Sequence, residues 1–394
     1  MAHDALTPLA PPVARTAAES TGLVYVSTDD PGLSRRRRGS GFIYRDASGA
    51  PVSDARIIAR IHSLAIPPAW KDVWICQDPL GHVQAVGQDE RGRRQYRYHP
   101  QFREVREAAK FDHLVAFAEA LPDLRAQVDR DLRLPGLPRE KVLATVVRLL
   151  ETTMIRIGNA DYARTNKSYG LTTLLNRHVS VQGSDLRFHF KGKSGKTWRL
   201  QVKDRRVAKI VRTCQDLPGQ NLFQYIEEDG ERQHVTSTDV NRYLKAVTDR
   251  DITAKDFRTW TGTVLAAVAI SEFDGVEAPA ERKKTLALAI RRVAEQLGNT
   301  PAICRRCYVH PDIQAAYLES GVALAATGDS LAHPEAGPTH LTPEEAMVLD
   351  FLRSDATASR EPSGQKRPAR GAQPPGARTN SGRSPAAVTT CLPD

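Results

Sequence analysis

Tyr308 is the residue of this chain whose type and neighbours most clearly suggest chemistry. It follows Arg305 and Arg306 in a segment, residues 297–311, that comes directly after an expected helix. A phenol ionises near pH ~10, so a tyrosine that acts as a nucleophile needs cations around it to stabilise anionic oxygens. Most tyrosines instead pack near the surface with a hydrogen-bonded hydroxyl, so Tyr308 becomes a candidate nucleophile only if other cations support it.

Three cationic residues far from Tyr308 in the sequence lie at special local positions. Arg156 closes an apolar helical pattern, Lys193 lies at the tip of an expected hairpin, and Arg258 lies just before a long apolar segment. Each has an ordinary structural explanation. An arginine at a helix end can reach water, hairpin lysines are usually solvated, and a single arginine can form a structural ion pair. Only their occurrence as a set carries information about function.

The expected secondary structure assigns these residues to defined elements. Apolar residues recur at helical spacing after Pro138 as far as Ile157, and the pattern stops at Gly158. Three stretches that alternate apolar and polar residues predict a three-stranded β-meander with lysines at one tip, over residues 179–182, 186–190 and 198–202. Further helices are expected over residues 237–247, 261–273, 280–297, 311–318 and 343–352.

The first part of the chain is β-rich. Between residues 22 and 100, short β-prone segments alternate with turn residues, and one helix is expected over residues 54–64. The β-prone segments are residues 23–26, 42–44, 73–76 and 82–86. This part ends in residues 91–99, where cations and aromatics interleave. The pattern suits phosphate contacts with rings against sugars or bases, and it also suits a solvated edge strand.

These patterns predict an α+β fold with two domains. The small β-rich N-terminal domain covers residues 22–100, and a larger, mainly helical domain that contains the meander covers residues 105–345. Residues 1–20 are rich in Ala, Pro and Thr, and residues 354–394 combine Pro, Gly, Ser and Arg without apolar periodicity. Both ends are therefore expected to be disordered, and the C-terminal tail is basic.

Composition narrows the classes of partner. With 394 residues, of which 40% are hydrophobic, the chain can bury a sizeable core. It has 56 Lys and Arg against 46 Asp and Glu, a formal net charge of +10, which favours a polyanionic partner such as nucleic acid. No apolar segment approaches the ~20 residues that span a bilayer, and the N-terminus does not resemble a secretory signal. The five cysteines form no closely spaced framework, so we expect a cytoplasmic protein that makes no membrane contact.

The separate motifs match one known pattern. Arg156 in an I-R-I-G context, Lys193 in F-K-G-K on a hairpin, Lys255-x-x-Arg258, and Tyr308 nine residues after Asn299 occur in this order. The set resembles the catalytic residues of the type IB DNA topoisomerases, in the compact branch shared by poxviruses and bacteria. The resemblance extends over roughly residues 22–345. Viral and eukaryotic members carry histidine where this chain has Asn299, whereas bacterial members commonly have asparagine.

The resemblance implies a role for each of these residues in phosphodiester transesterification. Tyr308 would attack the phosphate and form a 3′-phosphotyrosyl link, while Arg156 and Arg258 would bind the non-bridging oxygens. Asn299 would add a neutral hydrogen-bond donor, and Lys193 would protonate the leaving 5′-oxygen. The link conserves the phosphodiester energy, so supercoils of either sign would relax without ATP. The sequence fits this: it contains no phosphate-binding G-x-x-x-x-G-K-[ST] loop, and no carboxylate cluster suggests an obligatory metal or other cofactor.

The resemblance also implies how the protein meets double-stranded DNA. A monomer would close its two domains around the duplex as a clamp, acting in the cytoplasm in association with the nucleoid. Candidate DNA-contacting residues are Arg93, Arg94, Tyr96 and Tyr98 in the smaller domain, and Tyr162, Lys167, His178 and Lys255 in the larger one.

Two alternative functions compete with this interpretation. A site-specific tyrosine recombinase shares the catalytic fold and the Arg, Lys, Arg and Tyr residues. Its second arginine normally lies in an H-x-x-R motif, whereas position 255 here is lysine. Recombinases also usually have a helical N-terminal domain. A non-enzymatic DNA-binding protein would explain the charge and the Arg/Tyr segment, but it would leave the four ordered motifs to coincidence.

Overall fold

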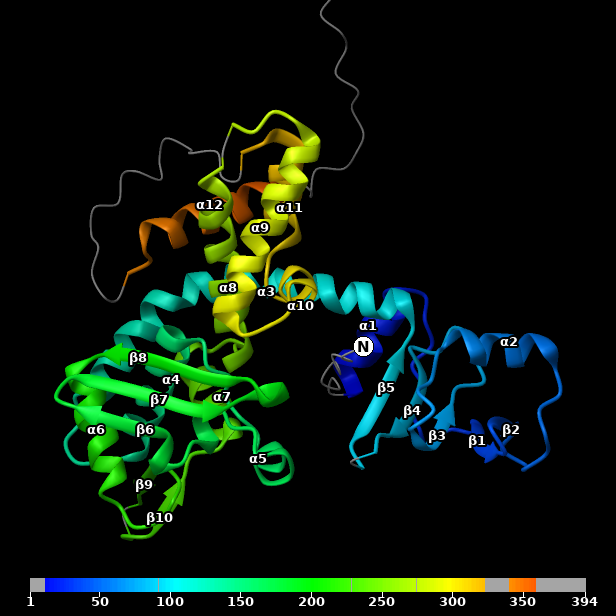
Figure 1. The fold of residues 1–394 in the computed structure, drawn as a ribbon, viewed down its shortest axis with the longest axis horizontal. Helices are drawn as coiled ribbons and strands as arrows, with labels where there is room; N and C mark the ends of the chain where they lie inside the picture. The colour runs from blue at the N-terminus through cyan, green and yellow to red at the C-terminus, as the bar shows by residue number, and fades with distance from the viewer. Residues whose placement is uncertain (1–10, 91, 228, 274, 323–339, 359–394) are drawn as a thin grey trace, which may run out of the picture.

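The computed structural model describes residues 11–358 except 91, 228, 274 and 323–339. Two bodies flank a central space, and the 32-residue helix α3 (Pro100–Asp131) runs from one to the other (Figure 1). None of the helices in these ranges is long and apolar enough to cross a membrane. The predicted α+β fold, with a β-rich N-terminal domain and a mainly helical catalytic domain, is confirmed.

The N-terminal body is an antiparallel sheet with strand order β2-β1-β3-β4-β5. Helix α2 (Ala55–Ser63) covers one face, where Ile61 packs against Leu33, Val73 and Ile75. Asp54 starts this helix because its side chain accepts hydrogen bonds from two backbone amides of the first turn. The strands are β1 (Leu33–Arg38), β2 (Gly41–Arg45), β3 (Lys71–Ile75), β4 (Val83–Gln88) and β5 (Arg94–Tyr98).

Both expectations of disorder at the chain ends need correction where the structure describes them. Residues 11–19 form helix α1 (Pro11–Glu19), because Ala14 and Ala18 lie one turn apart and pack on Phe102 of α3. At the other end, helix α12 (Pro343–Ala358) continues four residues past the expected boundary at 354. Residues 1–10 and 359–394 lie outside the described part of the chain.

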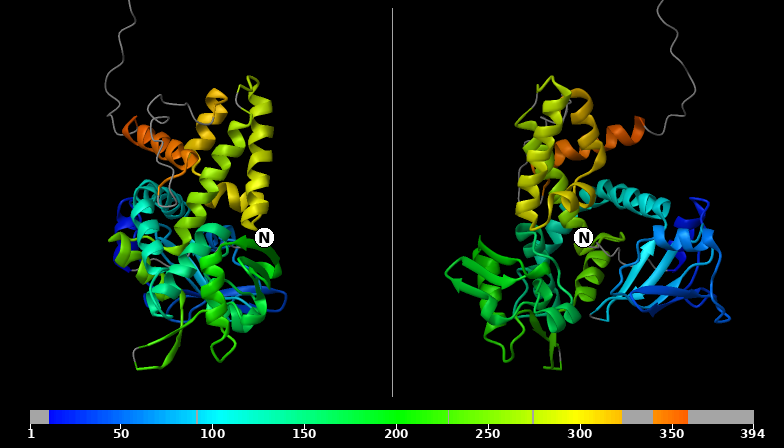
Figure 2. Two further views of the ribbon diagram at one scale, coloured as in Figure 1. Left: turned by 90° about the vertical axis from the view of Figure 1, so that its left-hand side faces the viewer. Right: turned by 45° about the vertical axis from the view of Figure 1, so that its right-hand side comes forward.

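The catalytic body joins the predicted meander to a helical bundle. Figure 2 shows that α8, α9 and α11 rise from the level of α3, with the meander at the opposite end of the body. In β7, Leu186, Phe188 and Phe190 alternate inward, as the sequence pattern predicts. Its elements are α4 (Arg139–Thr153), α5 (Ala160–Asn166), η1 (Leu171–Thr173), η2 (Asn176–His178), β6 (Val179–Gln182), β7 (Asp185–Lys191), η3 (Lys193–Gly195), β8 (Thr197–Lys203), α6 (Arg205–Gln215), β9 (Gln224–Ile226), β10 (Arg232–His234), α7 (Ser237–Thr248), α8 (Ala254–Ser271), α9 (Pro279–Leu297), α10 (Pro301–Cys307), α11 (Pro311–Ser320) and α12.

Two helix boundaries differ from the sequence-based expectation and both matter for the site. Helix α4 ends at Thr153 rather than Ile157, because Met154 takes a left-handed conformation with φ of 56°. Helix α8 begins seven residues earlier than expected, with a capping box between Thr253 and Asp256. Arg258 therefore lies inside a helix, while Arg156 lies beyond the end of one.

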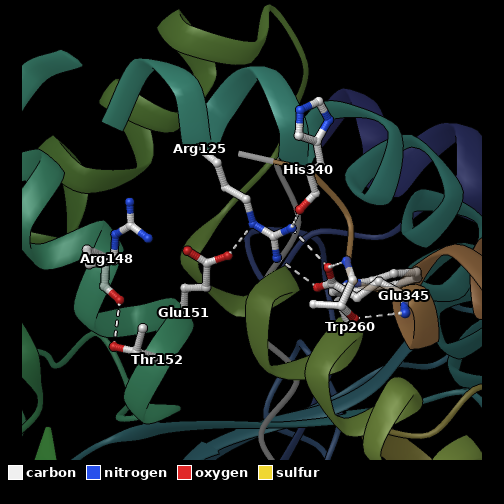
Figure 3. A network of polar contacts seen from close by, with 8 residues as sticks. Arg125, Arg148, Glu151, Thr152, Trp260, His340 and Glu345 are labelled. Atoms are coloured by element: carbon white, nitrogen blue, oxygen red, sulfur yellow. Dashed lines mark hydrogen bonds and ion pairs between the residues drawn. The ribbon is translucent and has the colours of Figure 1, made fainter. Parts of the chain in front are cut away.

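A buried ion network holds the helices behind these positions (Figure 3). Arg125 of α3 donates to Glu151 of α4 at 2.6 Å and to both carboxylate oxygens of Glu345 in α12, at 2.8 and 2.9 Å. The indole of Trp260 in α8 donates to Glu345 at 3.1 Å. One guanidinium thus connects the C-terminal half of α4 to the segment of α8 that carries Arg258.

Candidate active site

Arg156 lies in an extended segment that two glycines hold against η1. A side chain on Gly170 would place its Cβ 2.4 Å from the Arg156 carbonyl oxygen, and Gly158 needs its φ of +101°. The Arg156 carbonyl accepts from the Leu171 amide at 2.9 Å. The backbone of Arg156 is therefore fixed, and its guanidinium can be directed by local contacts.

Arg258 is the buried cation of the site, with 3% of its surface exposed. Its Nη1 donates to the Met154 carbonyl at the end of α4, and its Nη2 donates to the Leu297 carbonyl at the end of α9, at 2.6 Å. Burial, and after it the nearby charge of Arg156, lowers the pKa of Arg258 to about 10. Arg258 thus joins two helix C-termini, and its charge forms no ion pair with a carboxylate in the part of the chain that the structure describes.

Asn299 follows the end of α9, where Gly298 adopts a left-handed conformation with φ of 63°. Arg156 donates to the Oδ1 atom of Asn299, which leaves the amide Nδ2 as a donor for another group. Among the residues that the structure describes, neither Nδ2 of Asn299 nor Nε of Arg258 has an acceptor, although both atoms are buried. Buried donors without partners are costly, so this pair indicates a site for an oxygen-bearing ligand.

Tyr308 ends the short helix α10, and its ring centroid lies 5.2 Å from the guanidinium carbon of Arg258. Helix α8 also fixes the tyrosine backbone. Thr263 donates to the Tyr308 carbonyl at 3.3 Å, and a Cβ on Gly262 would lie 2.5 Å from the same oxygen. One helix therefore sets the positions of both the buried arginine and the phenol.

The arginines that precede Tyr308 in sequence do not contribute to this cluster in the same way. Arg305 and Arg306 are exposed on α10, and Arg305 donates to Gln314 of α11 at 3.0 Å. Cys304 is buried on the same helix, and burial raises the pKa of its thiol to about 11. The sequence neighbours of Tyr308 mainly attach α10 to the rest of the domain.

Lys193 is exposed at the β7–β8 tip, within the 3₁₀ turn η3. The tip is closed by hydrogen bonds from Gly192 to the Lys196 carbonyl at 2.8 Å and from Gly195 to the Gly192 carbonyl at 3.1 Å. Its base is attached to the segment after α5, since Tyr169 donates to the Lys191 carbonyl at 2.8 Å. The lysine thus stands on an ordered turn and keeps an accessible side chain.

The candidate DNA-contacting residues of the smaller domain lie on or beside β5. Tyr96 and Tyr98 stack at 5.8 Å, and the guanidinium of Arg94 lies 5.7 Å from the Tyr96 ring. Arg93 pairs with Asp89 at 2.6 Å and also lies 5.6 Å from the ring of Tyr162 in α5. Two residues expected to touch DNA therefore touch each other across the two bodies.

The remaining candidates lie in different environments. Lys255 is exposed in the first turn of α8, and Lys167 is exposed after the end of α5. His178 is buried, its ring packs edge-on to Tyr169 at 4.4 Å, and its Nδ1 accepts from the Leu175 amide at 3.1 Å. Burial lowers the pKa of His178. This geometry favours a supporting role for His178 behind the site over a direct phosphate contact.

The arginines of β1 (residues 35–38) are not among the DNA-contacting candidates that the sequence predicts. The strand register aligns Ser34 with Trp74, Trp74 with Val86, and Val86 with Tyr96, on the sheet face opposite α2. By alternation, Arg36 and Arg38 share this open face and both are exposed. The run of four arginines at 35–38 is the sequence signal for these cations. The same run does not predict a strand, because it has no alternation of apolar and polar residues.

Known proteins match both bodies of the chain. Residues 99–320 match the family described as eukaryotic DNA topoisomerase I, catalytic core, and residues 41–89 match bacterial DNA topoisomerase IB, N-terminal domain. DNA topoisomerase 1B of Acanthamoeba polyphaga mimivirus is 33% identical over 285 residues, which cover 71% of this chain and 85% of that protein. DNA topoisomerase 1B of vaccinia virus (strain Copenhagen) is 26% identical over 272 residues, covering 66% and 82%.

The match to the catalytic core spans more than half of the 394 residues, and it includes every residue of the cluster built around Arg258. The mimivirus relative extends the similarity over most of its own length. The two domains, the order of the motifs and the relatives all agree. The chain therefore belongs to the type IB DNA topoisomerase family, whose members are isomerases.

Proposed function

We propose that this topoisomerase relaxes supercoiled DNA through a covalent link on Tyr308. The phenol oxygen attacks the phosphorus of one strand and gives its proton to solvent water, a Tyr–O–P bond forms, and the bond from phosphorus to the 5′-oxygen breaks. The DNA 3′ end then carries the phosphotyrosyl link, and the 5′-hydroxyl is free. The observation that carries this proposal is the pair of buried donors Asn299 Nδ2 and Arg258 Nε, which find no acceptor among the described residues, with the Arg258 guanidinium 5.2 Å from the Tyr308 ring.

The cluster supplies the charge that the reaction requires. Negative charge grows on the two non-bridging oxygens of the phosphate in the transition state, and Arg156 and Arg258 offer permanent positive charge to them. Asn299 adds a donor whose orientation Arg156 fixes. Lys193 gives its proton to the leaving 5′-oxygen and recovers one when the strand is resealed. The reverse attack by the 5′-hydroxyl restores the phosphodiester, so no ATP and no metal ion are needed.

The two bodies act as a clamp on double-stranded DNA. Helix α3 connects them on one side of the central space, and the Arg93–Tyr162 contact supports closure on another (Figure 1). Exposed cations of β1 and β5 face outward from the open side of the sheet, where a polyanion would be attracted. Within a closed clamp the free 5′ strand turns about the intact strand, which relaxes supercoils of either sign. A monomer suffices for this cycle because one chain carries every residue assigned to it.

The test is relaxation of a supercoiled plasmid in the presence of EDTA and without ATP. The wild-type protein should relax both positively and negatively supercoiled DNA. Tyr308→Phe should abolish relaxation and keep DNA binding, since only the nucleophilic oxygen is removed. Full relaxation by Tyr308→Phe, or a covalent complex on the 5′ end of the cut strand, would overturn the proposal.

The recombinase alternative finds no support in the mimivirus and vaccinia virus relatives, which are both named DNA topoisomerase 1B. The chain also keeps lysine at 255, on the exposed first turn of α8. A recombinase would join two DNA duplexes. The same plasmid assay separates the two activities, because recombination yields dimers or deletions and relaxation yields topoisomers of unchanged length.

A further inference from the structure

Trp198 of β8 lies between two glycines that flank the proposed catalytic residues. A Cβ on Gly192 would lie 2.6 Å from the indole Nε1, and a Cβ on Gly298 would lie 2.9 Å from the indole Cζ2. Gly192 directly precedes Lys193, and Gly298 directly precedes Asn299. The indole therefore contacts the backbone beside the proposed acid with one ring and the backbone beside the proposed oxyanion donor with the other.

The orientation of this indole is set by the meander. Trp198 faces Phe190 in the β7–β8 ladder, and the two rings are stacked with centroids 6.2 Å apart and an interplanar angle of 3°. Phe190 is buried in the core of the domain, whereas Trp198 is half-buried. The indole is thus supported on one face by Phe190 of the sheet and extends toward the end of α9.

The contact joins two elements that are far apart in the sequence. Backbone hydrogen bonds close the tip around Lys193, but they lie within the tip itself, from Gly192 to Lys196. Asn299 belongs to the other side, where its backbone N–H donates to the Ala294 carbonyl of α9 at 2.8 Å. The Trp198 ring bridges these two sides by direct packing on both glycines.

We infer that Trp198 is a positioning residue for the cleavage step: it holds the β7–β8 tip against the Gly298–Asn299 turn so that Lys193 reaches the leaving 5′-oxygen. This inference rests on the proposed role of Lys193 as the proton donor. General acids contribute ~10²- to 10⁴-fold to rate, and a shift of about 1 Å in a reacting group costs ~10²-fold. Loss of the Trp198 contact should therefore remove a large part of the Lys193 contribution, whereas Asn299 keeps its backbone hydrogen bond to Ala294 and its contact with Arg156.

The test compares two DNA substrates in single-turnover cleavage by the full chain. One is a normal duplex, and in the other a bridging sulfur replaces the 5′-oxygen at the cleavage site. A thiolate leaves without a proton because thiols ionise near pH ~8.5, far below alcohols. Trp198→Ala and Lys193→Ala should both cleave the normal duplex more slowly, by ~10- to 100-fold for Trp198→Ala. Both should cleave the sulfur substrate at rates within about threefold of wild type.

The controls separate positioning from general packing. Asn299→Ala should remain slow on both substrates, because an oxyanion donor is needed whatever group leaves. Trp198→Phe should be the milder variant, since a smaller ring keeps part of the contact. Equal slowing of Trp198→Ala on both substrates, or wild-type cleavage of the normal duplex, overturns the inference. If Lys193→Ala is slow on the sulfur substrate as well, the proposed role of Lys193 fails and the inference fails with it.

Gly192→Ala tests the same contact while leaving the tryptophan in place. Gly192 has φ of −97° and ψ of −164°, which any residue adopts, so the added methyl group acts only through its clash with the indole. Like Trp198→Ala, Gly192→Ala should cleave the normal duplex slowly and the sulfur substrate at nearly the wild-type rate. Gly41→Ala is the matched control, because its methyl group would find its nearest neighbour, the Arg38 carbonyl, at 3.9 Å. If Gly192→Ala cleaves the normal duplex as fast as Gly41→Ala does, the inference is overturned.

Discussion

Replacing Asn299 by alanine tests whether the side-chain Nδ2 of Asn299 is an oxyanion donor. In the structure Arg156 binds Oδ1, so the amide group is held with Nδ2 available, and Nδ2 is buried without an acceptor in the described chain. Loss of one donor from an oxyanion site typically costs ~10²- to 10³-fold in rate, or ~2.7–4 kcal/mol. Arg156 and Arg258 share the same phosphate charge, so we expect the lower end of this range, about 10²-fold, for Asn299→Ala.

The assay is single-turnover cleavage of a duplex, with the covalent complex trapped by detergent and resolved on a gel. Asn299→Asp is the informative companion because it keeps the size of the side chain and replaces the donor by a charged acceptor. The new carboxylate would pair with Arg156 and repel the phosphate, so we expect a loss of ~10³-fold or more, beyond that of alanine. Asn299→His restores an N–H donor and should recover part of the rate.

Binding must be measured beside cleavage, by fluorescence anisotropy at fixed salt. A donor used mainly in the transition state leaves affinity nearly unchanged, within about threefold, while the cleavage rate falls. Cleavage by Asn299→Ala within about threefold of wild type would refute the donor role. A rate for Asn299→Asp equal to that of Asn299→Ala would refute the electrostatic part of the argument.

Three further outcomes follow from the contacts described above. Glu345→Ala leaves the buried Arg125 guanidinium with one carboxylate partner instead of two, so the free energy of unfolding measured in urea should fall by about 3 kcal/mol. Burial raises the pKa of Glu345, but hydrogen bonds from Arg125 outweigh this effect and hold the pKa below its usual 4.5. The stability that this pair gives the wild-type protein is therefore present above pH ~4.5 and is lost as the pH falls through the pKa of Glu345 in the folded protein. The variant should not show this loss. Cysteines that replace Arg93 and Tyr162 should be joined by a long bismaleimide crosslinker, because the observed contact is between the ends of two long side chains. The crosslinked protein should retain a circular plasmid through a high-salt wash and release the same DNA once it is linearised; release of the circle would contradict closure at this contact. Gly262→Ala should slow cleavage at least ~10-fold by displacing the Tyr308 backbone, and an unchanged rate would mean that α10 adjusts freely.

The sequence predicted which residues form the site better than it predicted how they meet. Arg156, Arg258 and Asn299 were proposed from their motifs, and the structure brings them together with Tyr308. The sequence predicts too long a helix before Arg156, because Met154 and Ile157 continue the apolar helical spacing and nothing local indicates the left-handed Met154. That turn depends on tertiary contacts, namely the Arg258 hydrogen bond to its carbonyl.

Two errors in the smaller domain have a common physical cause. Helix α1 has no charged amphipathic pattern, and its burial depends on Ala14 and Ala18 docking on Phe102, which a local pattern does not reveal. Strand β1 carries four consecutive arginines, and its inward position is taken by Arg35, whose guanidinium donates to the Ile66, Pro67 and Trp70 carbonyls. In both cases a partner distant in sequence determines the local structure, so composition alone is misleading.

The same dependence on distant partners explains how Arg258 combines a structural role with its proposed catalytic role. Its two Nη groups satisfy the last carbonyls of two helices, α4 and α9, and those helices end just before Arg156 and Asn299. Helix termini leave carbonyls unsatisfied, and a buried guanidinium that caps two of them fixes the distance between the turns that follow. Its Nε remains available, so the group that sets the geometry of Arg156 and Asn299 also offers a donor beside Tyr308. A lysine at this position could not bridge both carbonyls in a plane and still present a directed N–H, which accounts for arginine there in physical terms.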